Sequence, residues 1–83
     1  MNTVRPTPVL QSLSIAHPGA CLRITSVGMA HADELVREGI LPGAVVQVAS
    51  RTPLGGPVII CLGRVRLALS ADVAADVVGE PVP

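Results

Sequence analysis

Glycine and proline divide this 83-residue chain into short apolar runs, and this division limits the folds open to it. The chain holds eight glycines and eight prolines, and turn signals such as Pro18-Gly19, Pro42-Gly43 and Gly55-Gly56-Pro57 separate its apolar segments. Hydrophobic residues make up 49% of the sequence, yet Phe, Tyr and Trp are absent. The core must therefore be built from Val, Leu, Ile and Ala, in one domain too small for a deep, walled cleft.

Alternating apolar residues predict five short strands, over residues 22–27, 45–49, 58–62, 65–69 and 76–78. In the first strand, Leu22 and Ile24 share one face and Arg23 lies on the other. The third and fourth strands are joined by Gly63-Arg64, a connection suited to a tight hairpin. In and beside the fourth strand we expect the apolar residues to face the core and the arginines to face solvent: Val65, Leu67 and Leu69 inward, Arg64 and Arg66 outward.

The segment MAHADELVREGILPG predicts a short helix with a defined end. Its apolar face falls at positions i, i+3 and i+4, formed by Ala32, Leu35 and Val36. Gly39 stands where a left-handed cap is expected, Ile40 can fold back on the last turn, and Pro42 prevents continuation. We therefore expect the helix to end near Glu38, and we expect a second helical turn over residues 71–74.

The Gly-Gly-Pro before the apolar run VIICL has two interpretations, a phosphate-binding loop or the turn of a hairpin. A phosphate loop lies between a strand and a helix, so that the helix N-terminus faces the anion. Here Gly55 and Gly56 lie between two predicted strands, no Ser or Thr follows them, and the chain contains no lysine. The sequence therefore favours a hairpin connection whose glycines adopt positive φ.

Charge and composition exclude several classes of function. Six arginines balance six acidic residues, which gives a formal net charge of zero and an isoelectric point near 6.7. Proteins that bind nucleic acids usually carry a basic excess, and many stack bases on aromatic side chains, so we expect no nucleic-acid partner. No nucleophile-elbow or triad signature is present, so we also expect no enzymatic activity.

No segment qualifies as a membrane span. The longest stretch without a charged residue, residues 6–22, is interrupted by three prolines and by polar residues, and it makes a poor signal peptide. We therefore expect a cytoplasmic protein in which Cys21 and Cys61 are reduced thiols. Cys61, among apolar neighbours, is expected to be a buried small hydrophobe.

An ordered series of motifs resembles the FeoA family, small accessory proteins of bacterial ferrous iron uptake. The series begins with a Gly-apolar step followed by Pro-Gly (Gly39, Ile40, Pro42 and Gly43) and continues with a PLG-x-P loop (Pro53, Leu54, Gly55 and Pro57). It ends with a turn glycine (Gly63) and a closing Ala-x-x-apolar motif (Ala74 and Val77). The segment SLSIAHPG is similar to the usual start of the family, so the resemblance covers residues 13–78. Ser70 stands where the family often has a basic residue, and Gly79 where an apolar residue usually ends the last strand, which we therefore expect to stop early.

The resemblance implies a mostly β, SH3-like, partly open barrel of about five strands over residues 13–79, with a short helix after the first strand and a helical turn before the last. Residues 1–12 would form a flexible arm and residues 80–83 a tail. It further implies a non-enzymatic role beside FeoB, the membrane ferrous permease with a cytoplasmic G-domain, and self-association remains a further possibility. FeoA-like domains also form the C-terminal part of iron- and manganese-dependent repressors, but we expect no helix-turn-helix before the domain here and therefore no repressor role.

Metal-ligating residue types are present without a standard ligand spacing. His17 and Cys21 are four apart, and His31 lies two before Asp33 and three before Glu34. We expect no required cofactor, and adventitious divalent metal at a surface histidine is the stronger interpretation, with His31 on an exposed helix face the best candidate. The alternative function is a small metal-binding protein, an iron carrier or sensor.

The candidate partner-binding residues gather at two predicted loops: Arg51, Leu54, Gly55, Gly56, Arg64 and Arg66. A barrel can bring these loops together, and an apolar anchor ringed by arginine matches the composition of interface hot spots. Two alternatives stay open here. The arginines are either a contact patch for an acidic partner surface or a solvated outer face, and Leu54 either stands at the loop tip or is buried in the barrel mouth.

Overall fold

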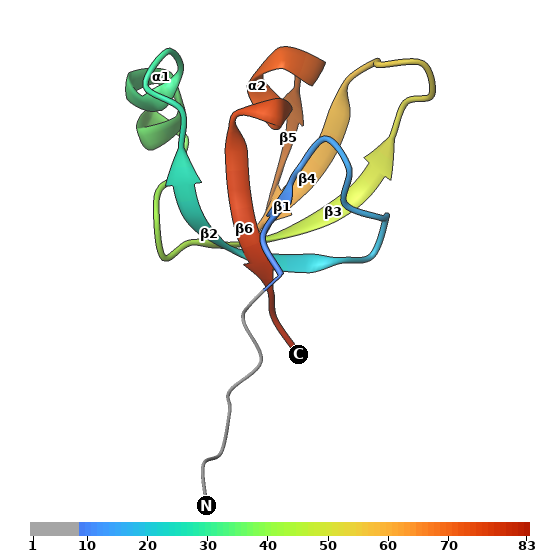
Figure 1. The fold of residues 1–83 in the computed structure, drawn as a ribbon, viewed down its shortest axis with the longest axis horizontal. Coiled ribbons are helices and arrows are strands. Elements are labelled where there is room, and N and C mark those ends of the chain that lie inside the picture. Colours follow the sequence, from blue (N-terminus) through green and yellow to red (C-terminus); the bar gives the residue numbers. More distant parts are fainter. Residues whose placement is uncertain (1–8) are drawn as a thin grey trace, which may run out of the picture.

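The computed structural model describes residues 9–83, and in this part of the chain a single antiparallel sheet curls into an open barrel (Figure 1). The strand order is β1-β6-β2-β3-β4-β5, so β1 and β5 are the two edges. The elements follow the chain as β1 (Gln11–Ser12), β2 (Cys21–Val27), α1 (Ala32–Arg37), β3 (Val45–Arg51), β4 (Val58–Leu62), β5 (Val65–Leu69), α2 (Ala71–Ala75) and β6 (Val77–Pro81). The predicted mostly β, SH3-like fold is confirmed.

The core is entirely aliphatic and lies inside the curl of the sheet. Alternate residues of the central strands point into it, as the sequence pattern predicted for β2 and β3. Each of the two short helices contributes one buried residue, and the segments that follow β1 and α1 contribute the other buried residues that lie outside the strands. The buried set is Leu13, Ala16, Leu22, Ile24, Leu35, Ile40, Val46, Val48, Val58, Ile60, Leu69, Ala74 and Val77.

Helix α1 ends as its sequence predicted. Gly39 has a φ of +88°, and its N–H donates to the Val36 carbonyl at 3.1 Å. The Ile40 N–H donates to the Leu35 carbonyl at 2.9 Å, and the Ile40 side chain is buried. These two bonds form a Schellman motif, which satisfies carbonyls that the end of a helix otherwise leaves unpaired. The motif turns the chain from α1 into the loop that leads to β3.

Strand β6 is longer than predicted, and the expectation that it stops early at Gly79 is wrong. The strand continues to Pro81 and pairs with β2 along Leu22↔Pro81, Arg23↔Glu80 and Ile24↔Gly79. A side chain at position 79 would meet the Arg23 carbonyl oxygen, 2.7 Å from an ideal Cβ. Gly79 therefore permits the close approach of the β2 backbone instead of ending the strand.

Strand β5 also departs from its predicted burial. Leu69 is buried and Leu67 half-buried, but Val65 is 54% exposed, so the expectation that Val65 faces the core is wrong. Val65 pairs with Leu62 at the hairpin end of β4 and β5, beyond the packed part of the barrel. The two-residue hairpin at positions 63 and 64 itself is confirmed.

The N-terminal part of the fold adds a strand that the sequence did not predict. Gln11 and Ser12 pair with Gly79 and Val78, which makes six strands where about five were expected. The predicted arm, residues 1–12, lies mostly outside the described residues. Within residues 9–83, no helix is long and apolar enough to cross a membrane.

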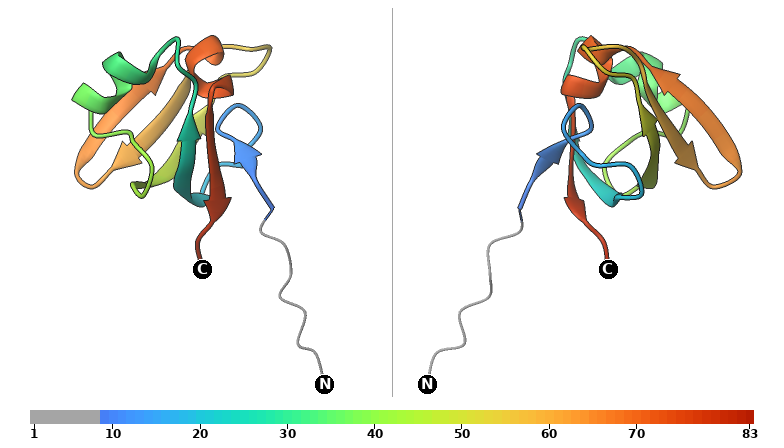
Figure 2. Two further views of the ribbon diagram at one scale, coloured as in Figure 1. Left: turned by 60° about the vertical axis from the view of Figure 1, so that its left-hand side comes forward. Right: turned by 90° about the vertical axis from the view of Figure 1, so that its right-hand side faces the viewer.

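Both helices lie at one end of the barrel, together with the long loop between β3 and β4 (Figure 1). The chain between β2 and α1 is held to the start of β6, because the Gly28 N–H donates to the Asp76 carbonyl at 2.8 Å. Figure 2 shows the β4–β5 hairpin extending away from this end of the barrel. The barrel therefore carries its helices and its longest hairpin loop on one rim.

Candidate functional site

The loop between β3 and β4, residues 52–57, is exposed on that rim along most of its length. It is closed by a hydrogen bond from the Thr52 N–H to the Pro57 carbonyl at 3.0 Å, directly beyond the Arg51↔Val58 pair. The register of β3 and β4 shifts between Val48 and Ser50, and such irregularities bend a strand and re-aim the residues that follow. The predicted hairpin at the Gly-Gly-Pro is therefore present, and β4 follows it where a phosphate loop would place a helix.

Leu54 stands at the tip of this loop, completely exposed to solvent. Of the two alternatives for this side chain, the structure selects the loop tip and not the barrel mouth. Its φ is +62°, and among residues 9–83 it is the non-glycine residue with a positive φ. That conformation costs on the order of 1–2 kcal/mol for an L-residue. The Leu54 side chain is not buried, so no packing compensates for the backbone strain and its apolar surface stays in contact with water. An exposed apolar residue in a strained conformation has the features of a recognition residue.

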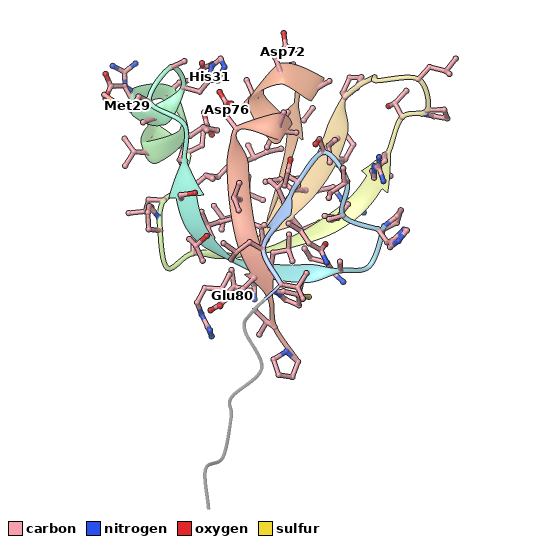
Figure 3. All side chains as sticks on the ribbon, viewed as in Figure 1. Met29, His31, Asp72, Asp76 and Glu80 are labelled. Atoms are coloured by element: carbon pink, nitrogen blue, oxygen red, sulfur yellow. The ribbon has the colours of Figure 1, made fainter. Side chains whose placement is uncertain are left out.

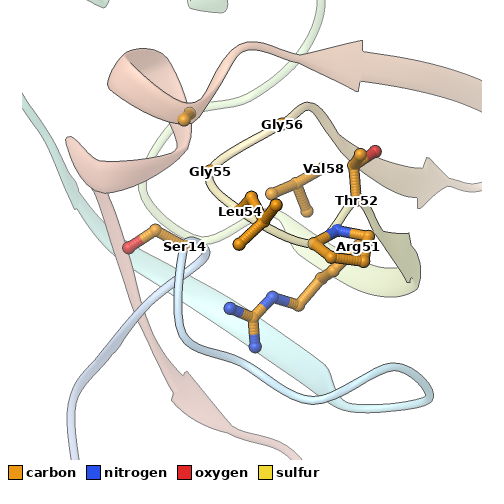
Figure 4. Close-up of a pocket in the computed structure, with 9 residues that line it drawn as sticks. Ser14, Arg51, Thr52, Leu54, Gly55, Gly56 and Val58 are labelled. Atoms are coloured by element: carbon orange, nitrogen blue, oxygen red, sulfur yellow. The ribbon is translucent and has the colours of Figure 1, made fainter.

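Arg51 connects the loop to the chain between β1 and β2. Its Nη1 donates to the carbonyl oxygens of Ile15 and Ala16, each at 3.4 Å. Figure 4 shows the guanidinium extending from the end of β3 beneath Leu54 toward that segment. Arg51 is thus a positioning residue that also leaves a positive charge at the surface.

A pocket of about 200 Å³ lies between the loop and its neighbours (Figure 4). Its lining comes from the loop, from the segment after β1 and from the start of α2: Ser14, Arg51, Thr52, Pro53, Leu54, Gly55, Gly56, Val58 and Ala71. Ile15, next to Ser14, is 61% exposed. Two exposed aliphatic side chains, Ile15 and Leu54, therefore belong to segments that Arg51 connects. Sequence reasoning missed Ser14 and Ile15, because both lie far from the loop in the sequence, and the hydrogen bond from Arg51 to Ile15 spans 36 positions.

Arg64 and Arg66 do not belong to this site, and the expectation that they gather with Arg51 is wrong. Arg51 pairs at the loop end of β4, opposite Val58, whereas Arg64 lies in the hairpin at the other end. Arg66 pairs with Cys61, near that same far end. The length of β4 therefore separates the two groups of arginines.

Gly56 also differs from its predicted conformation. The positive φ belongs to Leu54 and Gly55, while Gly56 does not have one. A Cβ at Gly56 would instead collide with the Cβ and Cγ2 of Thr52. Glycine is thus required at position 56 because the two arms of the loop pack closely, and not because of its backbone angles.

The candidate metal ligands do not converge. His17 is exposed in the turn before β2, Cys21 is half-buried in that strand, and Asp33 is exposed on α1. His31 is directed toward Asp76 (Figure 3). The distance between its Nε2 and the Asp76 Oδ2 is 3.4 Å. Within residues 9–83, no group of three or more His, Cys, Asp or Glu side chains is placed to hold a metal ion.

Both cysteines are free thiols on the outer surface of the sheet. Cys61 is half-buried, so the expectation that it is fully buried is wrong. Cys21 pairs with Gln47, and Gln47 pairs with Cys61, so one strand separates the two thiols. This row places the cysteines too far apart for a disulfide.

Comparison with known proteins identifies the family. A family model described as the FeoA domain matches residues 11–81, which is most of the chain. The chain belongs to the FeoA family. The predicted resemblance is thereby confirmed, and with it the assignment to the accessory proteins of ferrous iron transport. No curated protein matches the sequence significantly.

Solved structures agree with this assignment. The crystal structure of an iron uptake regulatory protein (FeoA) is 31% identical, with a TM-score of 0.80, and the match covers 89% of this chain and 99% of that protein. The solution structure of iron(II) transport protein A from Clostridium thermocellum is 28% identical, with a TM-score of 0.73, and covers 84% of this chain and 45% of that protein. A manganese-dependent transcriptional repressor reaches a TM-score of 0.83 at 16% identity, covering 93% of this chain but 44% of the repressor, and so shows a likeness of fold alone.

Proposed function

We propose that this FeoA-family chain is a non-enzymatic, cytoplasmic accessory protein of ferrous iron uptake that acts by binding the G-domain of the permease FeoB. Membership of the FeoA family supports the role in iron uptake, and the relatives named for iron uptake and iron(II) transport agree with it. The contact surface that we propose consists of Leu54, Arg51 and Ile15. We call this set the β3–β4 loop surface.

The observation that carries this choice is the exposed Leu54 with its positive φ. A loop held in one conformation by a rigid barrel loses little backbone freedom when a partner binds it. Arginine is among the residue types enriched at interface hot spots, and Arg51 lies beside the exposed Leu54. Ile15 enlarges the apolar area without extending the loop, because Arg51 holds the segment that carries it.

The proposal is tested by titrating the purified FeoB G-domain with this protein and with a Leu54→Ser variant. Truncating an anchor at the centre of an interface typically costs 2 kcal/mol or more, so we expect binding to weaken by about 30-fold. Val65→Ser is the matched control, because Val65 is also an exposed aliphatic residue but lies at the far end of β4 and β5. Binding by the control should be unchanged.

Two outcomes contradict the proposal. Equal binding by the Leu54→Ser variant and the unchanged protein would exclude the β3–β4 loop surface as the contact. Stoichiometric, tight Fe(II) binding by the monomer in equilibrium dialysis, without any binding to the G-domain, would instead support the iron carrier or sensor.

A further inference from the structure

The outer edge of β5 has no partner strand in the described part of the chain. β5 is the last strand in the sheet order and pairs with β4 alone. Figure 2 shows it at the free side of the sheet, with α1 nearby at the rim. An unpaired strand edge presents a row of backbone donors and acceptors to any extended segment that can align with it.

The hairpin fixes which residues of β5 offer those groups. In a two-residue hairpin the turn hydrogen bond joins the residues that flank it, here Leu62 and Val65. Hydrogen-bonded pairs alternate with non-bonded pairs along an antiparallel ladder. Leu67 is therefore bonded to β4, while Arg66 and Ala68 direct their N–H and C=O groups away from it. Both residues are exposed.

A groove of about 290 Å³ lies beside this edge, between β5 and α1. Its floor is largely apolar and its helix side carries two carboxylates: the lining residues are Glu34, Leu35, Glu38, Leu67, Ala68, Leu69, Ser70 and Val73. Glu34 lies on α1 and Glu38, four residues later, is the C-cap of the helix with a helical backbone conformation, so the two lie on one side of it. Among the described residues, neither carboxylate has a cationic group within 4.0 Å.

We propose that β5 binds an extended segment of a partner protein by strand addition, and that the segment alternates Lys or Arg and apolar residues on its inward face. Backbone bonds to Arg66 and Ala68 would hold the added strand, an apolar side chain would contact Leu67, and the cations would reach Glu34 and Glu38. This mode takes affinity from main-chain bonds and specificity from alternate side chains. The proposal is independent of the FeoB contact, because it uses a different surface of the barrel.

Charge complementarity distinguishes this occupant from a second copy of the same chain. The inward-facing residues of β5 are Leu67 and Leu69, and the exposed Val65 alternates with them beyond the packed part of the barrel; none of the three carries a charge. A second β5 placed along the edge would therefore bring no cation to Glu34 and Glu38. Opposite charges across an interface fix the register and suppress wrong partners. The groove thus favours a basic strand from another protein.

The probe is an acetylated and amidated peptide, TKTVTKT, titrated into the full chain at low salt and followed by amide spectra and hydrogen exchange. Its lysines and valine alternate with threonines, so they share one face of an extended strand. We expect saturable shifts at β5 and α1, and new exchange protection of the Arg66 and Ala68 amides. The Leu67 amide, already bonded to β4, should be protected with and without peptide.

Two N-methylated peptides test the direction of the backbone bonds. In an antiparallel addition, the residues opposite Arg66 and Ala68 form hydrogen-bonded pairs with them, and their side chains lie on the outer face of the sheet. The threonines beside the valine occupy these positions and donate to β5. N-methylation of both threonines should weaken binding by about tenfold or more, because it removes two hydrogen bonds. N-methylation of the valine, whose N–H points away from β5, should change the affinity less than twofold.

A matched pair of protein variants tests the charges. Glu34→Gln with Glu38→Gln should weaken binding by about threefold to tenfold, the range for two exposed ion pairs. Asp33→Asn with Asp72→Asn removes the same charge from residues that do not line the groove, and should leave the affinity unchanged. Equal binding by both double variants would overturn the proposal, as would shifts confined to another surface or no saturable binding. Concentration-dependent protection of the Arg66 and Ala68 amides without peptide would assign the edge to a second copy and also overturn it.

Discussion

At the scale of single residues, the β3–β4 loop requires glycine at two adjacent positions for different physical reasons. Gly55 has a φ of +77° and open space around it, so its backbone conformation is what excludes other residues. Gly56 has no positive φ, but the Thr52 side chain occupies the place of its missing Cβ. The loss of stability caused by a substitution at position 55 and at position 56 should therefore be relieved by different second substitutions.

Gly56→Val should destabilise the domain by about 1–3 kcal/mol, because the new side chain overpacks the loop against Thr52. The free energy of unfolding from urea titration measures this loss. In a chain that already carries Thr52→Gly, the Gly56→Val substitution should cost much less stability, because the colliding atoms of Thr52 are gone. A double-mutant cycle that shows no coupling between positions 52 and 56 would contradict this account of the crowding.

Leu54→Gly should leave the domain as stable as before, or more stable by up to about 1 kcal/mol. The exposed side chain loses no packing, and glycine relieves a left-handed conformation at the cost of a more flexible unfolded chain. The thermal midpoint checks this expectation. A fall of several degrees would mean that Leu54 packs on the domain, and its exposure would then no longer indicate a recognition role.

At the scale of elements, the two helices begin differently. Ser70 precedes α2 in an extended conformation, with φ −61° and ψ 158°, and its side chain accepts a hydrogen bond from the Val73 N–H. His31 precedes α1 and makes no such bond, since its ring is directed to Asp76. Serine is a favoured N-cap residue, and this hydrogen bond explains why Ser70 stands where the family often has a basic residue.

Ser70→Ala should lower the free energy of unfolding by about 0.5–1 kcal/mol through the loss of this cap, whereas Ser70→Asp should retain the stability. The low end of the range is expected because the cap bond is long, at 3.4 Å. Ser50→Ala is the control, since Ser50 is exposed and no side-chain hydrogen bond to it is present in residues 9–83. Equal stabilities of the Ser70→Ala and Ser50→Ala variants would show that the cap contributes nothing.

Elements defined by neighbouring residues were predictable from the sequence, and elements defined by distant ones were not. The end of α1 followed from Gly39, Ile40 and Pro42, because the Schellman motif is built from adjacent residues. The full length of β6 did not follow from the sequence. Gly79 looked like a strand end, and only the β2 backbone beside it explains why glycine stands there.

At the scale of the whole molecule, the candidate site was only half visible in the sequence. The hairpin loop itself was predicted, since its turn chemistry is local, but the sequence left open whether Leu54 stands at the loop tip or is buried in the barrel mouth. The tether from Arg51 to the Ile15 and Ala16 carbonyls was not predicted, because it depends on how the barrel closes. The error over Arg64 and Arg66 has a different origin, because the loops before and after one strand fall at its opposite ends. The predicted strand over residues 58–62 therefore already separated Arg51 from Arg64.

The barrel as a whole should not bind proline-rich peptides in the manner of eukaryotic SH3 domains. That mode packs a polyproline helix on a groove lined by aromatic side chains, and this chain contains no Phe, Tyr or Trp. The groove beside β5 is instead aliphatic with two carboxylates, and its adjoining strand edge offers backbone bonds that proline cannot fully use. Titration with a P-x-x-P peptide without basic residues should give no saturable shift in the amide spectrum. Micromolar binding confined to one groove would show that an aliphatic surface can replace the aromatic one, and this prediction would be wrong.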